Sequence, residues 1–206
     1  MRGERDALNW RPILWAGIFL AVLAWSAIRP HDYPTWLLEV VPALIGAAIL
    51  WATKSRFPLT GLSYSLILAH CVILMVGGHY TYAEVPLFDW IQEALDQSRN
   101  NYDKLGHFAQ GFIPAVVARE VVIVKRVFNS VAWRNFFIVC FCLAVSAFYE
   151  LIEWWVALAS EEASDSFLGT QGYMWDTQSD MAFALSGAIL ALLFLGKLQD
   201  RQLDAR

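Results

Sequence analysis

The chain has 206 residues and a formal net charge of −4; 58% of its residues are hydrophobic and only 17% are charged. Soluble domains are about 45–50% apolar and about 25% charged, and nucleic-acid-binding proteins present a basic face. These values exclude an ordinary soluble domain and give no support for nucleic acid as a partner. We expect a polytopic membrane protein whose main partner is the lipid bilayer.

Six long apolar runs predict an all-α fold, because a helix satisfies its own backbone hydrogen bonds in lipid. Each run is near the roughly 20 residues that a helix needs to cross a hydrocarbon core of about 30 Å. The first run is longer than the apolar region of a signal peptide, about 7–15 residues, so we expect it to be retained. The prediction is a single integral-membrane domain over residues 1–206, a six-helix bundle with helices at about 12–28, 36–53, 59–78, 105–124, 133–156 and 180–195.

The positions of lysine and arginine predict the orientation, since cytoplasmic loops carry more of these residues than outer loops do. Twelve of the 15 lie near the two termini and in the second-to-third and fourth-to-fifth connections. The alternate connections hold only Arg29, Arg99 and Lys104. We therefore expect both termini in the cytoplasm, with six spans between them.

The third-to-fourth connection, residues 79–102, is long and contains a second helical pattern. Pro86 suits the first position of a helix, and apolar residues then recur at a spacing that places them on one face. This pattern predicts a short amphipathic helix on the outer membrane surface, which is either a packing element or a lid over a site. The apolar face consists of Leu87, Trp90, Ile91, Ala94 and Leu95.

Three polar stretches stand at the ends of the apolar runs: residues 103–107 (DKLGH), 150–153 (ELIE) and 175–180 (WDTQSD). A charged side chain near the bilayer centre costs about 2.5–3.5 kcal/mol on insertion scales, so ionisable groups there are a sign of function. In the predicted topology the fourth and sixth helices begin outside and the fifth ends outside. The three stretches are therefore expected to meet on the outer face.

The spacing of the ionisable residues favours a shared site. Asp103 and His107 are four residues apart, and Glu150 and Glu153 are three apart, so each pair lies on one helix face. Two close carboxylates in a low-dielectric setting share a proton or bind a cation. One histidine with several carboxylates suits Zn, Mn or non-haem Fe, whereas carboxylates alone suit Mg or Ca, although the spacing matches no standard signature. The candidate ligands of a divalent metal ion are Asp103, His107, Glu150, Glu153, Asp176 and Asp180.

Catalytic and substrate-binding candidates come from the same stretches. A histidine or a glutamate can act as general base on a metal-activated water, which gives the catalytic candidates His107, Glu150, Glu153 and Asp180. Two glycines three residues apart before the sixth helix suit a turned loop whose N–H groups hold a lipid phosphate. The candidate substrate-binding residues are Lys104, Gln110, Gly169, Gln171, Gly172 and Trp175.

Structural explanations compete with each of these roles. Asp103, Asp176 and Asp180 can cap helix N-termini and complement the helix dipole, and Lys104 can extend to the interface. Glu150 and Glu153 are harder to explain in this way, because acids at a helix C-terminus oppose the dipole.

The polar stretches also carry a resemblance to a known family. Residues 102–112 (YDKLGHFAQGF), 149–155 (YELIEWW), 167–172 (FLGTQG) and 175–181 (WDTQSDM) resemble the YjdF-like bacterial inner-membrane proteins, a domain of unknown function, over most of the chain. More loosely, Asp-Lys-x-x-His, a Glu-bearing helix and an Asp at the head of a glycine-containing helix are similar to VanZ-type membrane proteins, which are linked to glycopeptide-antibiotic tolerance. The resemblance implies a multi-pass protein of the bacterial inner (plasma) membrane and envelope chemistry, without an established reaction.

Three functions are compatible with the sequence. The first is an outward-facing acidic site that binds or acts on an envelope lipid or cell-wall precursor with a divalent metal ion; as an enzyme it would be a metal-assisted hydrolase or transferase on a lipid-linked substrate. The second is a small-molecule or proton-coupled transporter, which calls for polar residues at mid-depth or broken helices. The third is a non-catalytic structural or partner-binding membrane protein.

Overall fold

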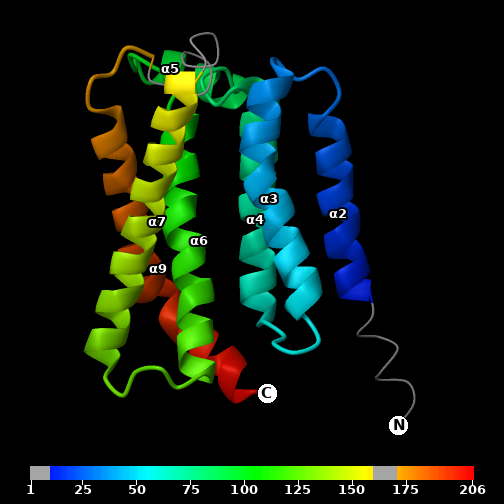
Figure 1. Ribbon diagram of the computed structural model, residues 1–206, viewed down its shortest axis with the longest axis vertical. Helices are drawn as coiled ribbons and strands as arrows, with labels where there is room; N and C mark the ends of the chain where they lie inside the picture. Colours follow the sequence, from blue (N-terminus) through cyan, green and yellow to red (C-terminus); the bar gives the residue numbers. More distant parts are fainter. Residues whose placement is uncertain (1–9, 160–170) are drawn as a thin grey trace.

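The secondary structure is helical, as predicted, throughout the computed structural model, which describes residues 10–159 and 171–206 (Figure 1). Within these ranges the chain forms a bundle of long helices with one short helix across an end. The helices are α2 (Trp10–Ser26), α3 (Tyr33–Thr53), α4 (Gly61–Tyr80), α5 (Pro86–Ala94), α6 (Tyr102–Val124), α7 (Val131–Ala159) and α9 (Asp176–Asp204).

Five of these helices, α3, α4, α6, α7 and α9, are long and apolar enough to cross a membrane. Helix α2 has 17 residues, a length of about 25 Å at 1.5 Å per residue, and is shorter than the others. The start of α2 and the end of α9 lie at the same end of the bundle (Figure 1). This arrangement agrees with an even number of crossings, while the count of six and the cytoplasmic position of both termini stay predictions.

Two predicted helix boundaries were wrong in a way that bears on the site. Helix α6 begins at Tyr102 rather than at 105, so its polar first turn is helical. Helix α9 runs from Asp176 to Asp204 rather than over 180–195. An apolar run locates only the part of a helix that contacts lipid, whereas these polar turns are helical because their side chains bond to the rest of the protein.

The long helices form two groups. In the first, α2, α3 and α4 pack around Phe19, Val40 and Met75. In the second, α6, α7 and α9 pack around Val116, Ile138 and several smaller buried residues. Helix α4 contacts α6 and joins the two groups.

The closest approach of two helices is between α6 and α9. A Cβ atom placed on Gly111 of α6 would lie 1.8 Å from the carbonyl oxygen of Ala184, and one placed on Gly187 of α9 would lie 2.3 Å from the carbonyl oxygen of Phe108. Small residues at membrane helix interfaces permit this contact of backbones. Glycine is therefore required at both positions.

At the end of the bundle where α5 lies, Tyr82 joins the two helix groups. Thr81 and Tyr82 both adopt left-handed backbone angles, with φ of 60° and 52°. The Tyr82 ring then lies against Gly77 of α4 and Gly106 of α6, where an added Cβ would be 2.2 Å and 2.9 Å from ring atoms. The turn after α4 thus positions the start of α6.

The opposite end of the bundle is held by a buried polar network around Glu120 of α6. The Glu120 carboxylate accepts hydrogen bonds from the Thr60 N–H at 2.6 Å, the Thr60 hydroxyl at 2.7 Å and the Ser63 hydroxyl at 2.5 Å. It also accepts one from the Arg206 guanidinium at 2.7 Å. Gln199 of α9 donates to the Val116 carbonyl oxygen at 2.8 Å. These bonds explain why α9 continues beyond its apolar run.

Helix α5 turns its apolar face away from the protein. Leu87, Trp90 and Leu95 are each more than half exposed, and none of the α5 residues is buried. An exposed apolar face of this kind suits contact with lipid. The position of α5 on the outer membrane surface nevertheless stays a prediction.

We expect Gly111→Ala to lower the stability of the protein, because the added methyl group would force α6 and α9 apart. Overpacking in a core typically costs about 1–3 kcal/mol, which should appear as a lower thermal unfolding midpoint in detergent. The matched control is Gly46→Ala, since an added Cβ there meets nothing within 4 Å and alanine favours a helix by about 0.8–1 kcal/mol over glycine. Equal midpoints for the two variants would contradict the tight α6–α9 contact.

The predicted orientation leads to a labelling experiment. Glu93 and Arg56 are both exposed and lie in connections at opposite ends of the bundle. In spheroplasts a membrane-impermeant maleimide should label Glu93→Cys but not Arg56→Cys. The reverse pattern would show that the basic connections face outward.

Candidate functional site

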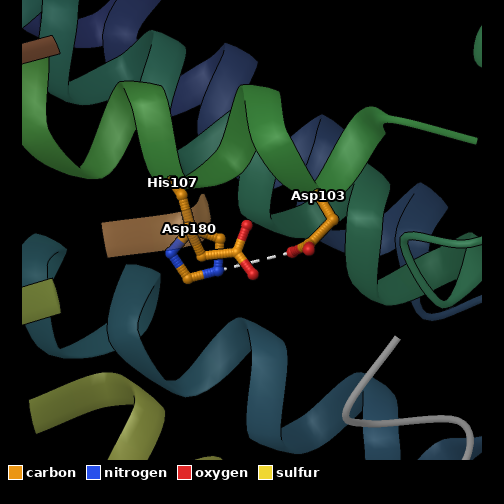
Figure 2. A group of neighbouring side chains, drawn as sticks. All are labelled: Asp103, His107 and Asp180. Atoms are coloured by element: carbon orange, nitrogen blue, oxygen red, sulfur yellow. Dashed lines mark ion pairs between the residues drawn. The ribbon is translucent and has the colours of Figure 1, made fainter. Parts of the chain in front are cut away.

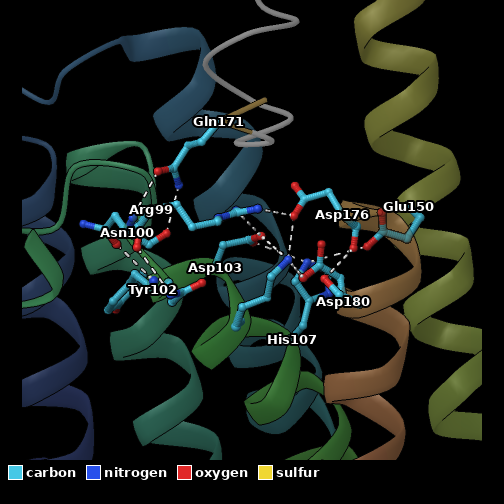
Figure 3. A network of polar contacts seen from close by, with 12 residues as sticks. Arg99, Asn100, Tyr102, Asp103, His107, Glu150, Gln171, Asp176 and Asp180 are labelled. Atoms are coloured by element: carbon cyan, nitrogen blue, oxygen red, sulfur yellow. Dashed lines mark hydrogen bonds and ion pairs between the residues drawn. The ribbon is translucent and has the colours of Figure 1, made fainter. Parts of the chain in front are cut away.

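The three polar stretches of the sequence meet at the α5 end of the bundle (Figure 3). The first turns of α6 supply Asp103, Lys104 and His107, α7 supplies Glu150 and Glu153 from its C-terminal half, and α9 supplies Asp176 and Asp180 from its first turns. All seven residues are at most 9% exposed. We call these seven residues, together with Arg99, the outer polar cluster, after the predicted orientation of the chain, which stays a prediction.

One side of the outer polar cluster is a set of short ion pairs. The Lys104 ammonium lies 2.5 Å from Asp176 Oδ1 and 2.6 Å from Asp180 Oδ1. The Arg99 guanidinium lies 2.5 Å from the same Asp176 oxygen and 3.7 Å from Asp103. Lys104 and Arg99 therefore hold the first turn of α9 against the first turn of α6.

The other side of the cluster centres on His107. Its Nε2 atom lies 3.4 Å from Asp103 Oδ1 and 3.6 Å from Glu150 Oε1. Figure 2 shows Asp103 and His107 of α6 together with Asp180 of α9. Within the described residues, His107 Nδ1 and Glu150 Oε1 are buried without a hydrogen-bond partner. This side is thus less completely paired than the lysine side.

His107 belongs to two groups of side chains that can hold a metal ion. One is Asp103, His107 and Asp180; the other is His107, Glu150 and Glu153. In each group one ligand atom from each residue lies within 4.8 Å of the others. A single imidazole with carboxylates is a donor set that suits Zn, Mn or Fe.

The charges of the outer polar cluster do not balance. It contains five carboxyl groups against two permanent cations, Arg99 and Lys104, and one histidine. Burial of a carboxylate without a compensating charge is strongly unfavourable. A divalent cation beside His107 would supply the missing positive charge.

A further acid, Glu39 of α3, extends the cluster toward the other helix group. Glu39 is 5% exposed, and its Oε2 atom accepts a hydrogen bond from the Tyr149 hydroxyl of α7 at 3.1 Å. Tyr82 is also close to Glu39, and burial raises the pKa of the Tyr82 phenol well above its usual value, so this hydroxyl remains a neutral donor. Glu39 thus links the two helix groups at the site.

Sequence reasoning did not place Arg99 or Tyr149 in the site. Arg99 precedes the apolar run, but its spacing of four from Asp103 was a usable signal. Glu39 is a lone acid inside an apolar run, which is itself a sign of function or of a buried partner. Nothing in the sequence pattern distinguishes Tyr149 from other interfacial aromatic residues.

Five of the six predicted metal ligands lie together. Asp103, His107, Glu150, Glu153 and Asp180 all occur in the two groups that can hold an ion. Asp176 occurs in neither group, and its carboxylate contacts Arg99 and Lys104 instead. The position of Asp176 therefore favours a structural role.

The predicted substrate-binding residues are dispersed. Lys104 lies in the cluster. Gln110 follows His107 by three residues on α6 and has a buried side-chain oxygen without a partner among the described residues.

The other candidates precede α9. Gln171 bonds to the Asn100 backbone through the oxygen and the nitrogen of its side-chain amide, and these bonds attach the segment before α9 to the turn before α6. Trp175 is 56% exposed. Gly172 has a φ of 80° with nothing near its Cβ position, and Gly169 lies outside the described residues.

Comparison with known proteins gives a family. The sequence matches the family described as "Predicted membrane protein (DUF2238)" over residues 11–201. It is 52% identical over 182 residues to "Inner membrane protein YjdF" of Escherichia coli (strain K12), an alignment that covers 88% of this chain and 87% of that protein. No solved structure matches the sequence.

The ion pairs of Lys104 predict a large effect of its removal. Lys104→Met should destabilise the protein by about 3–5 kcal/mol, because it leaves Asp180 buried without its cation. Adding Asp180→Asn should restore part of the loss. The control is His31→Ala, since the His31–Glu84 pair is exposed and such pairs contribute at most about 1 kcal/mol. Thermal unfolding in detergent measures all three, and a loss that Asp180→Asn does not reduce would contradict the pairing.

Proposed function

This chain belongs to the DUF2238 family of membrane proteins, and from that premise we propose that it binds a divalent cation at the outer polar cluster. The protein is a multi-pass protein of the inner membrane, like its YjdF relative. In the proposed function, the cation would promote a reaction of an envelope lipid or a lipid-linked cell-wall precursor at the outer face. The family itself has no established activity.

The observation that carries the proposal is the position of His107. Its imidazole is buried among carboxylates from three helices, and ligand atoms of Glu150 and Glu153 lie within 4.8 Å of one of its nitrogens and of each other. Neither glutamate has a lysine or arginine partner among the described residues. Buried acids without a cation are the ordinary surroundings of a metal ion.

The second of the two groups, His107 with Glu150 and Glu153, is the better cation site. Asp180 of the first group already has the Lys104 ammonium at 2.6 Å, and a divalent cation beside an ammonium would be repelled. Asp103 lies 3.4 Å from His107 on the same side. It adds a further carboxylate next to Nε2, the same imidazole nitrogen that Glu150 faces.

The chemistry that this arrangement supports is hydrolysis or group transfer. A divalent cation held by His107, Glu150 and Glu153 would supply Lewis acidity, which would increase the acidity of a nearby water. A carboxylate of the cluster takes one proton from that water as the water oxygen bonds to phosphorus or to a carbonyl carbon. The bond to the leaving oxygen breaks and the proton passes to that oxygen; in a transferase a hydroxyl group of the acceptor replaces the water.

The distribution of polar residues argues against the transporter alternative. The core between the outer polar cluster and the Glu120 network includes Val116, Ile138 and small residues of α6, α7 and α9. His70, in the middle of α4, lines a cavity whose other lining residues in the described chain are apolar. A transport path across the membrane needs polar side chains or broken helices at mid-depth. Gln110 and Ser146 extend the polar region inward from His107 only at the outer side of this core.

The purely structural alternative accounts for half of the cluster. Arg99, Lys104, Asp176 and Asp180 pair closely and hold α6 to α9 without further help. The same explanation fails for Glu150 and Glu153, which are buried in the C-terminal half of α7 and have His107 as their nearest cationic partner among the described residues. A role in binding explains both halves.

The proposal predicts metal binding that depends on His107. Protein purified without chelators should contain about one divalent ion per chain, and His107→Ala should lower the affinity by about tenfold or more, equivalent to at least about 1.4 kcal/mol. Mass spectrometry of the metals and titration calorimetry measure the two quantities. His31→Ala is the matched control, because His31 lies in the connection between α2 and α3 and pairs with Glu84. The proposal fails if the wild-type protein binds no divalent metal, or if both variants bind it equally well.

A further inference from the structure

A cavity of about 720 Å³ lies beside the outer polar cluster, between α5, α6, α9 and the turns that precede α6 and α9. Its volume is within the range of about 300–1,000 Å³ that is usual for ligand sites. Lys104 lines this cavity and is also part of the cluster. The cavity and the outer polar cluster are therefore neighbours that share two side chains, Arg99 and Lys104.

The wall of the cavity has a cationic part and an apolar part. Arg99 and Lys104 line it, and among its lining residues in the described chain none is acidic. The apolar part consists of Phe88 of α5, Phe108 of α6 and Phe183 of α9 together with neighbouring leucine. A ligand that satisfies both parts has an anionic group joined to a hydrocarbon chain.

We infer that this cavity binds an anionic lipid, with its phosphate against Arg99 and Lys104 and the start of its hydrocarbon chain along the three phenylalanines. The inference rests on the proposed function and names its substrate class. Arginine and lysine are the residues that bind phosphate oxygens in proteins, and clusters of basic residues at the membrane surface recognise lipid headgroups.

The ion pairs of the cluster are compatible with a bound phosphate. A lysine ammonium has three donors, and the two hydrogen bonds of Lys104 to described residues go to Asp176 and Asp180. The ring of Tyr173 lies 5.7 Å from Lys104 and 5.8 Å from the Arg99 guanidinium. Arg99 and Lys104 are each 7% exposed, so a phosphate would reach them only through the parts of their side chains that line the cavity.

The surroundings favour a lipid over a soluble phosphate. Phe88 faces the cavity from α5, while Leu87 and Trp90 of the same helix are exposed on the other side. A cavity next to an exposed apolar face opens at the level of the membrane interface. Lys104 contacts Asp180, and Asp180 lies beside His107 of the proposed cation site, so a phosphate bound at Lys104 would lie near that site.

Ser179 offers a way to fill the cavity without altering a charge. Ser179 of α9 lines the cavity, and its hydroxyl donates to the Asp176 carbonyl oxygen at 3.0 Å. Ser186, two turns further along α9, makes the equivalent bond to the Phe183 carbonyl oxygen at 2.8 Å and does not line the cavity. Ser179→Trp and Ser186→Trp are thus a matched pair.

The experiment measures lipid binding to the purified full-length protein in detergent by native mass spectrometry. The probes are dioleoylphosphatidic acid and dioleoylphosphatidylcholine, which have the same chains, and glycerol 3-phosphate as the soluble competitor. The wild type should prefer phosphatidic acid by about tenfold or more. Ser179→Trp should lose this preference and Ser186→Trp should keep it. Glycerol 3-phosphate should not displace the lipid.

Three results would overturn the inference: equal binding of the two lipids by the wild type, an unchanged preference in folded Ser179→Trp, or displacement by glycerol 3-phosphate, which would indicate a soluble ligand. If Ser179→Trp does not fold, Phe183→Ala takes its place, with Phe194→Ala as control, since Phe194 is 72% exposed on the same helix outside the cavity. Phe183→Ala should weaken phosphatidic acid binding and Phe194→Ala should not; equal affinities would overturn the inference.

Metal content measured on the same preparations separates this inference from the proposed function. A preference for phosphatidic acid in a protein that binds no metal would support the lipid site and reject the metal site. Metal binding in a protein without that preference would reject the lipid site alone. Ser179→Trp should retain its metal, because Ser179 is in neither group of metal-binding residues.

Discussion

The contact between the backbones of α6 and α9 is the constraint on which the site depends. Gly111 and Gly187 have no room for a side chain, so the axes of the two helices are fixed relative to each other. Lys104 lies two turns before Gly111, and Asp180 lies one turn before Ala184 on the facing helix. The lysine reaches both Asp176 and Asp180 because this contact brings the two helix starts together.

Much of the fold was predictable from the sequence because the bilayer restricts the choices. Apolar runs of sufficient length must be helical, and alternating basic loops then place residues 103, 150 and 176 at one end. The same reasoning could not find the ends of α6 and α9, since hydropathy does not register a polar turn that is bonded to other helices. It also could not predict the contact of Tyr149 with Glu39, because that contact depends on how the two helix groups pack. The metal and lipid roles of the cluster stay predictions.

The two ends of the bundle differ in how completely their buried charged groups are paired. At Glu120 both carboxylate oxygens accept hydrogen bonds, including one from the guanidinium of Arg206. At His107 the carboxylates outnumber the cations, and His107 Nδ1 and Glu150 Oε1 are without partners among the described residues. A fully paired network adds rigidity, whereas an incompletely paired one is suited to receiving a ligand. The contrast within one chain is the strongest general argument that the outer end has a function.

The two polar networks have a consequence for how the protein sits in its membrane. Along α9, Asp180 and Gln199 are 19 residues apart, a distance of about 28 Å at 1.5 Å per residue. Bacterial and other bilayers have hydrocarbon thicknesses close to this value, about 30 Å. With each network at a boundary of the hydrocarbon region, the spacing between the two networks would set the vertical position of the protein and limit its tilt. A change in bilayer thickness would then strain the protein between these two networks.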